Sequence, residues 1–103
     1  MSKKVAIQQG SILKVEKISF PVLVVSKPFF NESGLVIACP IIEKSVAAPL
    51  HIKIEAKQYS GFVHCEDLKL LDIKSRRHSV VDSIEMSDII NISDAIQGIF
   101  DYI

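Results

Sequence analysis

Residues 20–42 read FPVLVVSKPFFNESGLVIACPII, and this stretch decides the fold. It contains two apolar runs rich in β-branched residues, Val22–Val25 and Leu35–Ile42, separated by residues that break regular structure. Short runs of this kind favour β-strands over helices. Because neither run alternates with polar residues, both faces of each strand should be covered. The two strands are therefore predicted to lie at the centre of a barrel or of a covered sheet.

The composition predicts one small globular domain. The chain has 103 residues, of which 49% are hydrophobic, and 12 acidic residues balance 12 basic ones. The N-terminal sequence lacks the features of a signal peptide, and no apolar run approaches the roughly 20 residues that span a bilayer. We therefore expect a cytoplasmic protein that does not bind membranes. A nucleic-acid binder of zero net charge would have to use a local basic patch.

The two cysteines are expected to be structural. Cys39 and Cys65 each lie within a separate apolar run, a placement typical of buried thiols. Two isolated cysteines do not form the spacing of a disulfide framework or of a metal site. No metal and no other cofactor is predicted from them.

The rest of the chain predicts further short strands and one helix. Residues 1–9 are expected to form a flexible tail, which leaves residues 10–103 as the domain. Isoleucines at spacings of three and four residues predict an amphipathic helix at about 86–102. Additional strands are predicted within residues 11–18, 51–55, 62–67 and 70–71, with residues 79–81 as a candidate edge strand. The expected architecture is mainly β, with about six short strands and a C-terminal helix.

Two of these segments alternate between apolar and polar residues. In residues 51–55 the alternation places His51 on the outward face, where we predict an ordinary surface residue. In residues 62–67 it places His64 and Glu66 on one face, about 7 Å apart. A histidine beside a carboxylate is a pair suited to proton transfer, since histidine changes charge near neutral pH. The structural alternatives are a partly buried histidine and a carboxylate in a solvated turn.

Several segments, read in order, resemble the PemK/MazF family of bacterial toxins, which includes Kid and has the gyrase poison CcdB as a structural relative. They are GSILKV at 10–15, PVLVVS at 21–26 followed by Phe30-Asn31, LVIACPI at 35–41 and GFVHCEDLKLLD at 61–72, with a closing helix after them. The resemblance implies an SH3-like antiparallel barrel that forms a homodimer. It also implies an acidic antitoxin as partner and, in most members, cleavage of single-stranded mRNA.

The chain departs from the family pattern at the cleavage site. Phe20 stands where the resemblance implies an arginine, and Ile42 stands where it implies threonine or serine. Residues 64–67 read HCED where Kid has Arg-Cys-Asp-Gln. The interpretation is therefore a metal-independent endoribonuclease in which Glu66 is the base for the 2′-hydroxyl and His64 is the acid for the departing 5′-oxygen.

Positive charge for the RNA is expected from two sets of residues. In the first set, Lys69 or Lys44 would supply the charge beside the phosphate in place of the missing arginine. The other set is the only concentrated basic tract in the sequence, which is the best candidate for contacts with the RNA backbone. The predicted RNA-binding residues are Lys44, Lys69, Lys74, Arg76, Arg77 and His78.

Two other functions remain open at this point. A degenerate toxin could have lost cleavage and could act by binding a protein. A gyrase-poison variant of this kind is weakly supported, because residues 94–103 are similar to the CcdB tail but the chain contains no tryptophan. The second of these functions is that of an SH3-like interaction domain that binds a peptide.

Overall fold

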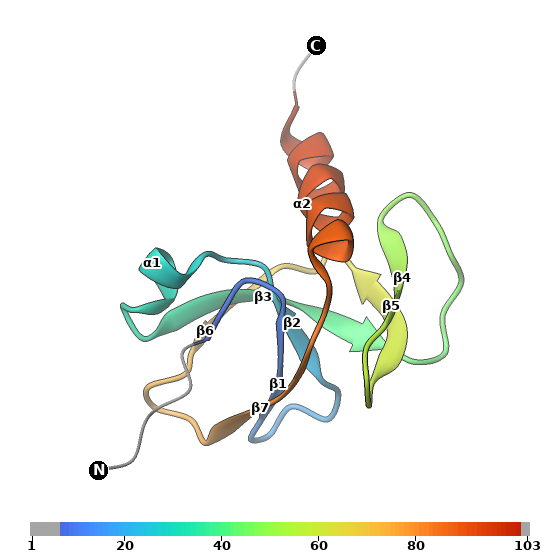
Figure 1. The fold of residues 1–103 in the computed structure, drawn as a ribbon. Helices are drawn as coiled ribbons and strands as arrows, with labels where there is room; N and C mark the ends of the chain where they lie inside the picture. Colours follow the sequence, from blue (N-terminus) through green and yellow to red (C-terminus); the bar gives the residue numbers. More distant parts are fainter. Residues whose placement is uncertain (1–6, 102–103) are drawn as a thin grey trace.

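The computed structural model describes residues 7–101, and this part of the chain forms seven strands and two helices (Figure 1). The elements are β1 (Ser11–Val15), β2 (Val22–Val24), α1 (Pro28–Asn31), β3 (Leu35–Ile42), β4 (His51–Glu55), β5 (Ser60–His64), β6 (Lys69–Asp72), β7 (His78–Ser83) and α2 (Met86–Phe100). The predicted mainly β architecture with a C-terminal helix is confirmed. The candidate edge strand at 79–81 is a strand, β7. No helix within residues 7–101 is long and apolar enough to cross a membrane.

The two strands of the central stretch, β2 and β3, lie in the middle of the sheet. The strand order is β4-β5-β3-β2-β1-β7, and β6 pairs with β3 on the same edge as β5. All neighbouring strands are antiparallel. The sequence prediction that these two runs form the centre of a covered sheet is therefore confirmed.

Two hydrophobic cores lie on opposite faces of β2 and β3. Leu23 and Cys39 belong to the first core, and Val24 and Ala38 belong to the second. Successive side chains of a strand point to opposite faces, so a strand that is covered on both sides needs an apolar residue at every position. The first core also contains Ile12, Ile41, Ile54, Val63, Cys65 and Ile92, and the second contains Leu13, Val15, Val22, Val36, Leu71 and Ile73.

On one edge, β3 changes its partner partway along its length. Leu35–Ala38 pairs with β6, and Ile41–Ile42 pairs with β5. Pro40 lies between the two ladders, where its missing N–H removes no hydrogen bond from either of them. The connection from β5 to β6 crosses this gap as a turn that begins after His64. The strand predicted at 62–67 is thus shorter than expected, and Glu66 lies in the turn.

Asp82 on β7 attaches the tip of the β4–β5 hairpin to the other side of the sheet. Its Oδ2 accepts hydrogen bonds from the backbone N–H groups of Gln58 at 2.6 Å and Tyr59 at 3.2 Å. Within residues 7–101 no hydrogen-bonded ladder joins the ends of the sheet, so closure of the expected barrel is not detected. Burial raises the pKa of Asp82, but the N–H groups of Gln58, Ser83 and Tyr59 outweigh burial and hold the pKa below its ordinary value.

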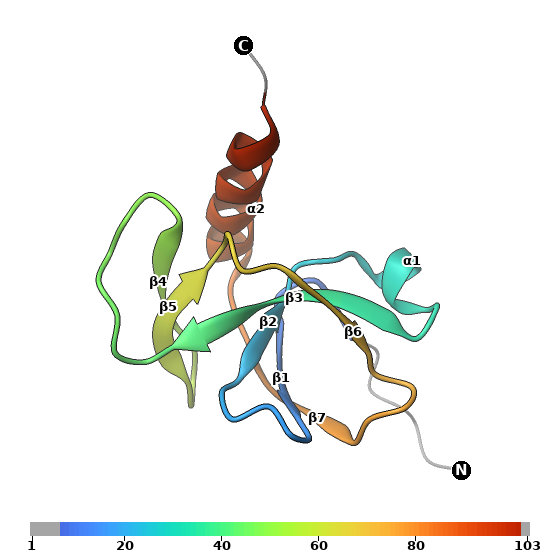
Figure 2. The ribbon, with the colours of Figure 1, turned by 180° about the vertical axis from the view of Figure 1, so that it is seen from behind.

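Helix α2 packs on the first core through Ile92, which is 1% exposed, and its second half projects beyond the sheet (Figures 1 and 2). The helix ends at Phe100, two residues before the predicted end. Of the tail predicted at 1–9, residues 1–6 lie outside the described part. Residues 7–9 contact the domain: Ile7 packs on the second core, and the side-chain amide of Gln9 donates to the carbonyl of Val25 at 3.0 Å.

Replacement of Asp82 by alanine should lower the free energy of unfolding at neutral pH by about 1 kcal/mol, since a charged acceptor of backbone N–H groups is lost from a partly solvated position. A carboxylate with a lowered folded-state pKa stabilises the protein fully above its unfolded pKa, and this contribution disappears as the pH falls through the folded value. The difference between parent and Asp82→Ala should therefore vanish in acid. Urea unfolding at several pH values measures this difference, with Asp94→Ala at an exposed position of α2 as the matched carboxylate control.

Candidate functional site

Two histidines lie side by side on the outward face of the β4–β5 hairpin. His51 and His64 are cross-strand partners, and their rings stack with centroids 3.8 Å apart and planes 10° from parallel. The backbone under them is held firmly, because Val63 and Cys65 on either side of His64 belong to the first core. The N–H of Cys65 also donates to the carbonyl of Leu50 at 2.8 Å. The two rings are thus presented on a rigid surface.

Glu66 in the following turn completes a cluster with the two histidines. Its Oε2 lies 2.8 Å from Nε2 of His51, with His51 26% exposed and Glu66 45% exposed. One ligand-capable atom from each of His51, His64 and Glu66 lies within 4.8 Å of the other two. The hydrogen bond from His51, helped by a backbone hydrogen bond, lowers the pKa of Glu66 below its ordinary value. Glu66 is therefore an ionised carboxylate at neutral pH, adjacent to two imidazoles.

Ser45, in the loop after β3, also contacts this cluster. Its Oγ lies 2.9 Å from Nε2 of His64. This contact orients the His64 ring and places the preceding residue, Lys44, in the loop beside the cluster. Lys44, one of the predicted RNA-binding residues, is exposed and directly precedes Ser45 in the chain.

The cysteines near the cluster are not reactive groups. Burial raises the pKa of Cys39 to about 12 and that of Cys65 to about 11, with smaller contributions from neighbouring negative groups. Both cysteines are free and buried, as the sequence predicted. At neutral pH both are neutral thiols, which are neither nucleophiles nor good metal ligands.

The fold separates the predicted RNA-binding residues into two groups. Lys69 stays near the cluster, because it follows the same turn and forms an ion pair with Asp67 at 3.5 Å. The basic tract 74–78 lies beyond Asp72, which pairs with Leu35 at the opposite end of β3 from the hairpin. With about 3.3 Å per strand residue, the tract lies roughly 15–20 Å along β3 from the histidines. The sequence could not show this separation.

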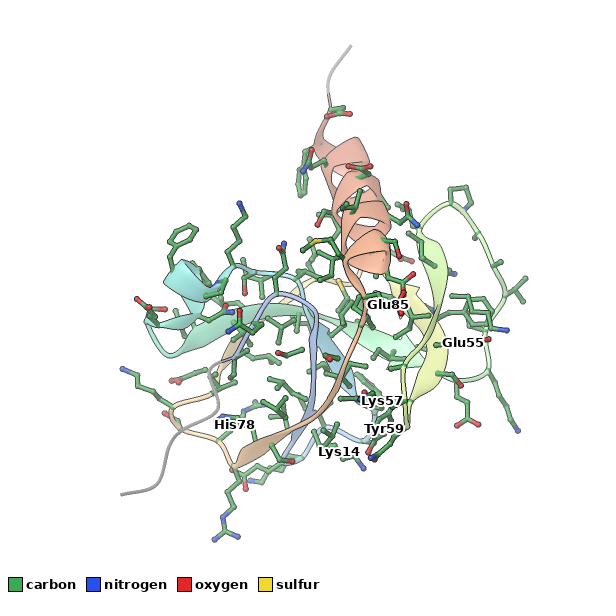
Figure 3. The ribbon with its side chains drawn as sticks, in the orientation of Figure 1. Lys14, Glu55, Lys57, Tyr59, His78 and Glu85 are labelled. Carbon is green, nitrogen blue, oxygen red and sulfur yellow. The ribbon has the colours of Figure 1, made fainter. Side chains whose placement is uncertain are left out.

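The basic tract borders a broad surface groove at the adjoining ends of the paired strands β1 and β7. Lys14, Arg77 and His78 contribute to its lining, together with Glu16 and Ser79, and its volume is about 360 Å³. Figure 3 shows Lys14 and His78 on this side of the molecule and Glu55 on the β4–β5 hairpin. Lys14 is a further cation that the sequence analysis did not select. Lys14 and Arg77 are two cationic side chains in this groove, beside the acidic Glu16, and cationic side chains are suited to contacts with phosphates.

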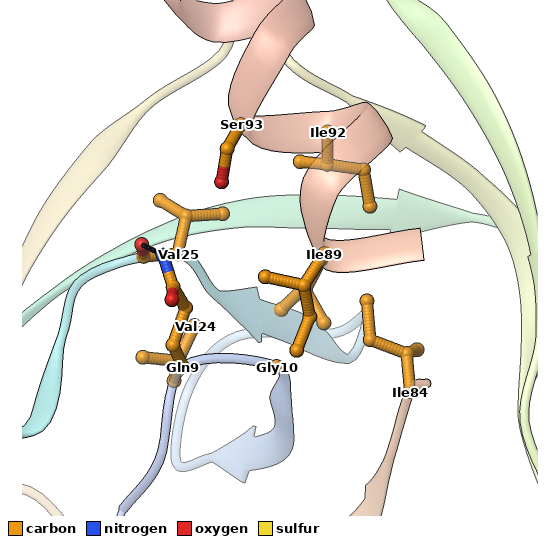
Figure 4. A pocket seen from close by; sticks show the side chains of 9 residues that line it. Gln9, Gly10, Val24, Val25, Ile84, Ile89, Ile92 and Ser93 are labelled. Atoms are coloured by element: carbon orange, nitrogen blue, oxygen red, sulfur yellow. Dashed lines mark hydrogen bonds between the residues drawn. The ribbon is translucent and has the colours of Figure 1, made fainter. Parts of the chain in front are cut away.

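A second, smaller pocket lies at the base of α2 and is not a functional site. Its volume is about 10 Å³, which holds at most one water molecule. Figure 4 shows its lining, in which aliphatic side chains such as Ile89 and Ile92 predominate and Gln9 is already hydrogen-bonded. The pocket offers neither the space nor the polar groups that a substrate needs.

His51 makes contacts that its sequence pattern did not predict. It faces outward as predicted, but it is half-buried and bonded to Glu66 instead of being an ordinary surface residue. The signal that could have found it is the hairpin register. A turn centred on residues 57–58 places residue 51 opposite residue 64, as the observed pairing does.

The comparison with protein families identifies the fold independently. Residues 11–100 match the family described as "PemK-like, MazF-like toxin of type II toxin-antitoxin system". The chain belongs to this family. The resemblance stated from the sequence is thereby confirmed, although no curated protein matches the chain.

Solved structures of MazF proteins share the fold of this PemK/MazF family member. In the MazE–MazF complex of Deinococcus radiodurans (Form-I), the similar chain has a TM-score of 0.85 and 21% identity, with 94% of this chain and 98% of that chain covered. An endoribonuclease in complex with its cognate antitoxin from a mycobacterial species has a TM-score of 0.79 and 15% identity, with 92% and 95% covered. At these identities the likeness shows the fold alone.

Replacement of His51 by alanine should raise the pKa of Glu66 toward the ordinary value of a glutamate, since the variant lacks the group that contributes most to lowering it. Glu66 should then take up its proton at a higher pH than in the parent protein. An NMR titration of the Glu66 side-chain carboxyl carbon measures this change. The remote variant His78→Ala is the control, and an identical Glu66 titration in all three proteins would contradict the assigned hydrogen bond.

Proposed function

We propose that this chain is a toxin endoribonuclease that cleaves single-stranded RNA without a metal ion, and that a cognate antitoxin neutralises it. The observation that carries the proposal is the cluster of one carboxylate and two imidazoles within 4.8 Å on an accessible face of the hairpin. Membership in the toxin family and the endoribonuclease reported for a mycobacterial relative support the reaction class.

The proposed reaction uses Glu66 as base and His64 as acid. Glu66 removes the proton of the 2′-hydroxyl, and the 2′-oxygen attacks the adjacent phosphorus. The bond from phosphorus to the 5′-oxygen breaks, and His64 donates a proton to that oxygen. The products are a 2′,3′-cyclic phosphate and a 5′-hydroxyl. His51 acts as a positioning residue, because its bond to Glu66 holds the base ionised and in place.

Charge for the phosphate is proposed to come from the lysines near the cluster. Lys44 precedes the serine that contacts His64, and Lys69 follows the turn that carries Glu66. Either lysine can offset the negative charge that develops in the transition state. The groove with Arg77 and His78 lies several nucleotides away and is proposed to bind the RNA backbone outside the cleaved bond.

A degenerate toxin that acts by binding a protein is the second candidate. The observation that favours it is the position of Phe20, which packs on the second core, away from the cluster of His64. The resemblance implies a catalytic arginine at this position, so one charge of the family site has no direct replacement. The gyrase-poison variant has no further support from the fold.

The partners of the protein are proposed to be a second copy and an acidic antitoxin. The relative from Deinococcus radiodurans was solved as MazE–MazF, and the mycobacterial endoribonuclease was solved with its cognate antitoxin. In β3 the residues Ala38–Ile41 are buried, and the partly exposed residues are Leu35, Ile37 and Ile42, so this strand offers less surface to a second copy than α2 does. Exposed apolar side chains on α2 leave that helix as the better dimer surface, namely Met86, Ile90, Ile99 and Phe100.

The test of the reaction is incubation of the chelator-treated protein with single-stranded RNA, followed by analysis of the new ends. We expect 2′,3′-cyclic phosphate ends with the parent protein and a loss of at least about a hundredfold in rate with His64→Ala and with Glu66→Gln, the usual size of an acid or base contribution. Glu55→Gln, at the far end of β4, is the matched control that keeps the parent rate.

Two results of this assay would contradict the proposed reaction. One is the absence of cyclic phosphate ends with the parent protein, and the other is undiminished cleavage by His64→Ala. Arrest of bacterial growth with intact RNA would then favour the degenerate toxin, and trapped gyrase complexes would favour its gyrase-poison variant.

The dimer is tested by light scattering. Phe100 is 71% exposed near the end of α2, so Phe100→Asp should convert a dimer into monomers by placing a charge in an apolar interface. Phe29→Asp on α1, where the side chain is 76% exposed, is the matched control that leaves the mass unchanged. A dimer that survives Phe100→Asp and dissociates with Phe29→Asp would place the interface at α1 instead.

A further inference from the structure

We propose that His51, His64 and Glu66 form a binding site for a divalent transition metal ion, with Zn²⁺ as the best-matched ion. The three residues come from β4, from β5 and from the turn that follows β5, and each offers one donor atom within 4.8 Å of the others. The site joins three separate positions of the chain, so it exists only in the folded protein. The predicted effect of the metal ion on RNA cleavage rests on the proposed function, but metal binding itself does not.

The donor set matches zinc chemistry. Two imidazole nitrogens and one carboxylate oxygen are ligands that Zn²⁺ accepts, and they leave a fourth position open. The set contains no thiolate, because both cysteines are buried thiols. Mg²⁺ prefers oxygen ligands and octahedral geometry, so it should not compete at a site with two nitrogens.

The geometry needs only side-chain movement. Donors bound to one tetrahedral zinc ion at about 2.0–2.1 Å lie about 3.3 Å apart. His51 and Glu66 are already 2.8 Å apart, so the main change is a tilt of the stacked rings that brings a nitrogen of His64 toward them. The backbone need not move, since the residues that flank His64 are fixed in the first core.

Ser45 extends the site beyond its three ligands. Its hydroxyl lies 2.9 Å from Nε2 of His64. A hydrogen bond to the ring of a ligating histidine fixes its orientation, and such contacts are usual around bound metals.

Metal binding would inhibit the proposed cleavage reaction. A zinc ion would occupy the carboxylate of Glu66 and the nitrogen lone pair of His64, so neither group could exchange protons with RNA. The proposed function therefore predicts that the same residues serve either proton transfer or metal binding, and that free Zn²⁺ switches the protein off.

Direct binding is tested by titrating chelator-stripped protein with Zn²⁺ in a calorimeter. We expect the parent protein to bind one Zn²⁺ per chain and no Mg²⁺. The affinity for Zn²⁺ should be at least about tenfold weaker in His51→Ala and in Glu66→Gln, since even changes to residues that only contact the ligands have effects of this size. The matched control His78→Ala removes an exposed histidine on β7 and should bind Zn²⁺ as the parent does. Nitrogen NMR signals from the rings of His51 and His64 should shift on binding.

The metal site is overturned if the parent does not bind Zn²⁺, if His51→Ala binds it as tightly as the parent, or if the histidine signals do not shift. A separate assay compares RNA cleavage in chelator with cleavage at one equivalent of Zn²⁺. Cleavage in chelator that stops with Zn²⁺ supports the regulatory role, and undiminished cleavage by the zinc-bound protein refutes it. An inactive parent in chelator refutes the proposed function, whereas the binding titration still decides the metal site.

Discussion

Burial of both faces of β2 and β3 is the constraint on which the rest of the structure depends. The two strands separate two hydrophobic cores, and every other strand packs in or against one or both of them. A slip of either strand by one residue would move each of its side chains into the opposite core, where it would not fit the close packing. Packing in the two cores therefore sets the register of β2 and β3. Strand pairing with β3 then fixes the position of the β4–β5 hairpin.

The break in the ladder at Pro40 determines where the candidate site lies. Because β3 pairs first with β6 and then with β5, the chain between these strands must cross the gap as a turn. Glu66 lies in that turn, and His64 is the last residue of the strand before it. The apolar face of the hairpin joins the first core, so its polar face carries the two histidines at the surface. The site thus combines a rigid support with an accessible surface.

The same three side chains are suited to two kinds of chemistry for a single reason. A proton and a metal ion bind to the same lone pairs of imidazole and carboxylate. A cluster that can move a proton at neutral pH can therefore also hold a transition metal, and each use excludes the other. Ser45 and His51 matter to both uses, since they orient His64 and Glu66.

Local pattern in the sequence determined the strands, the C-terminal helix, the buried cysteines and the family, because hydrophobic periodicity and residue type act over a few neighbouring positions. Only the tertiary structure decided the early end of β5 and the pairing of His51 with His64. It also decided the hydrogen bonds from the hairpin tip to Asp82 and the distance between the basic tract and the histidines. These features depend on register and on contacts between residues far apart in the chain. A single sequence holds no direct record of such contacts, since many registers satisfy the same local pattern until side chains must pack together.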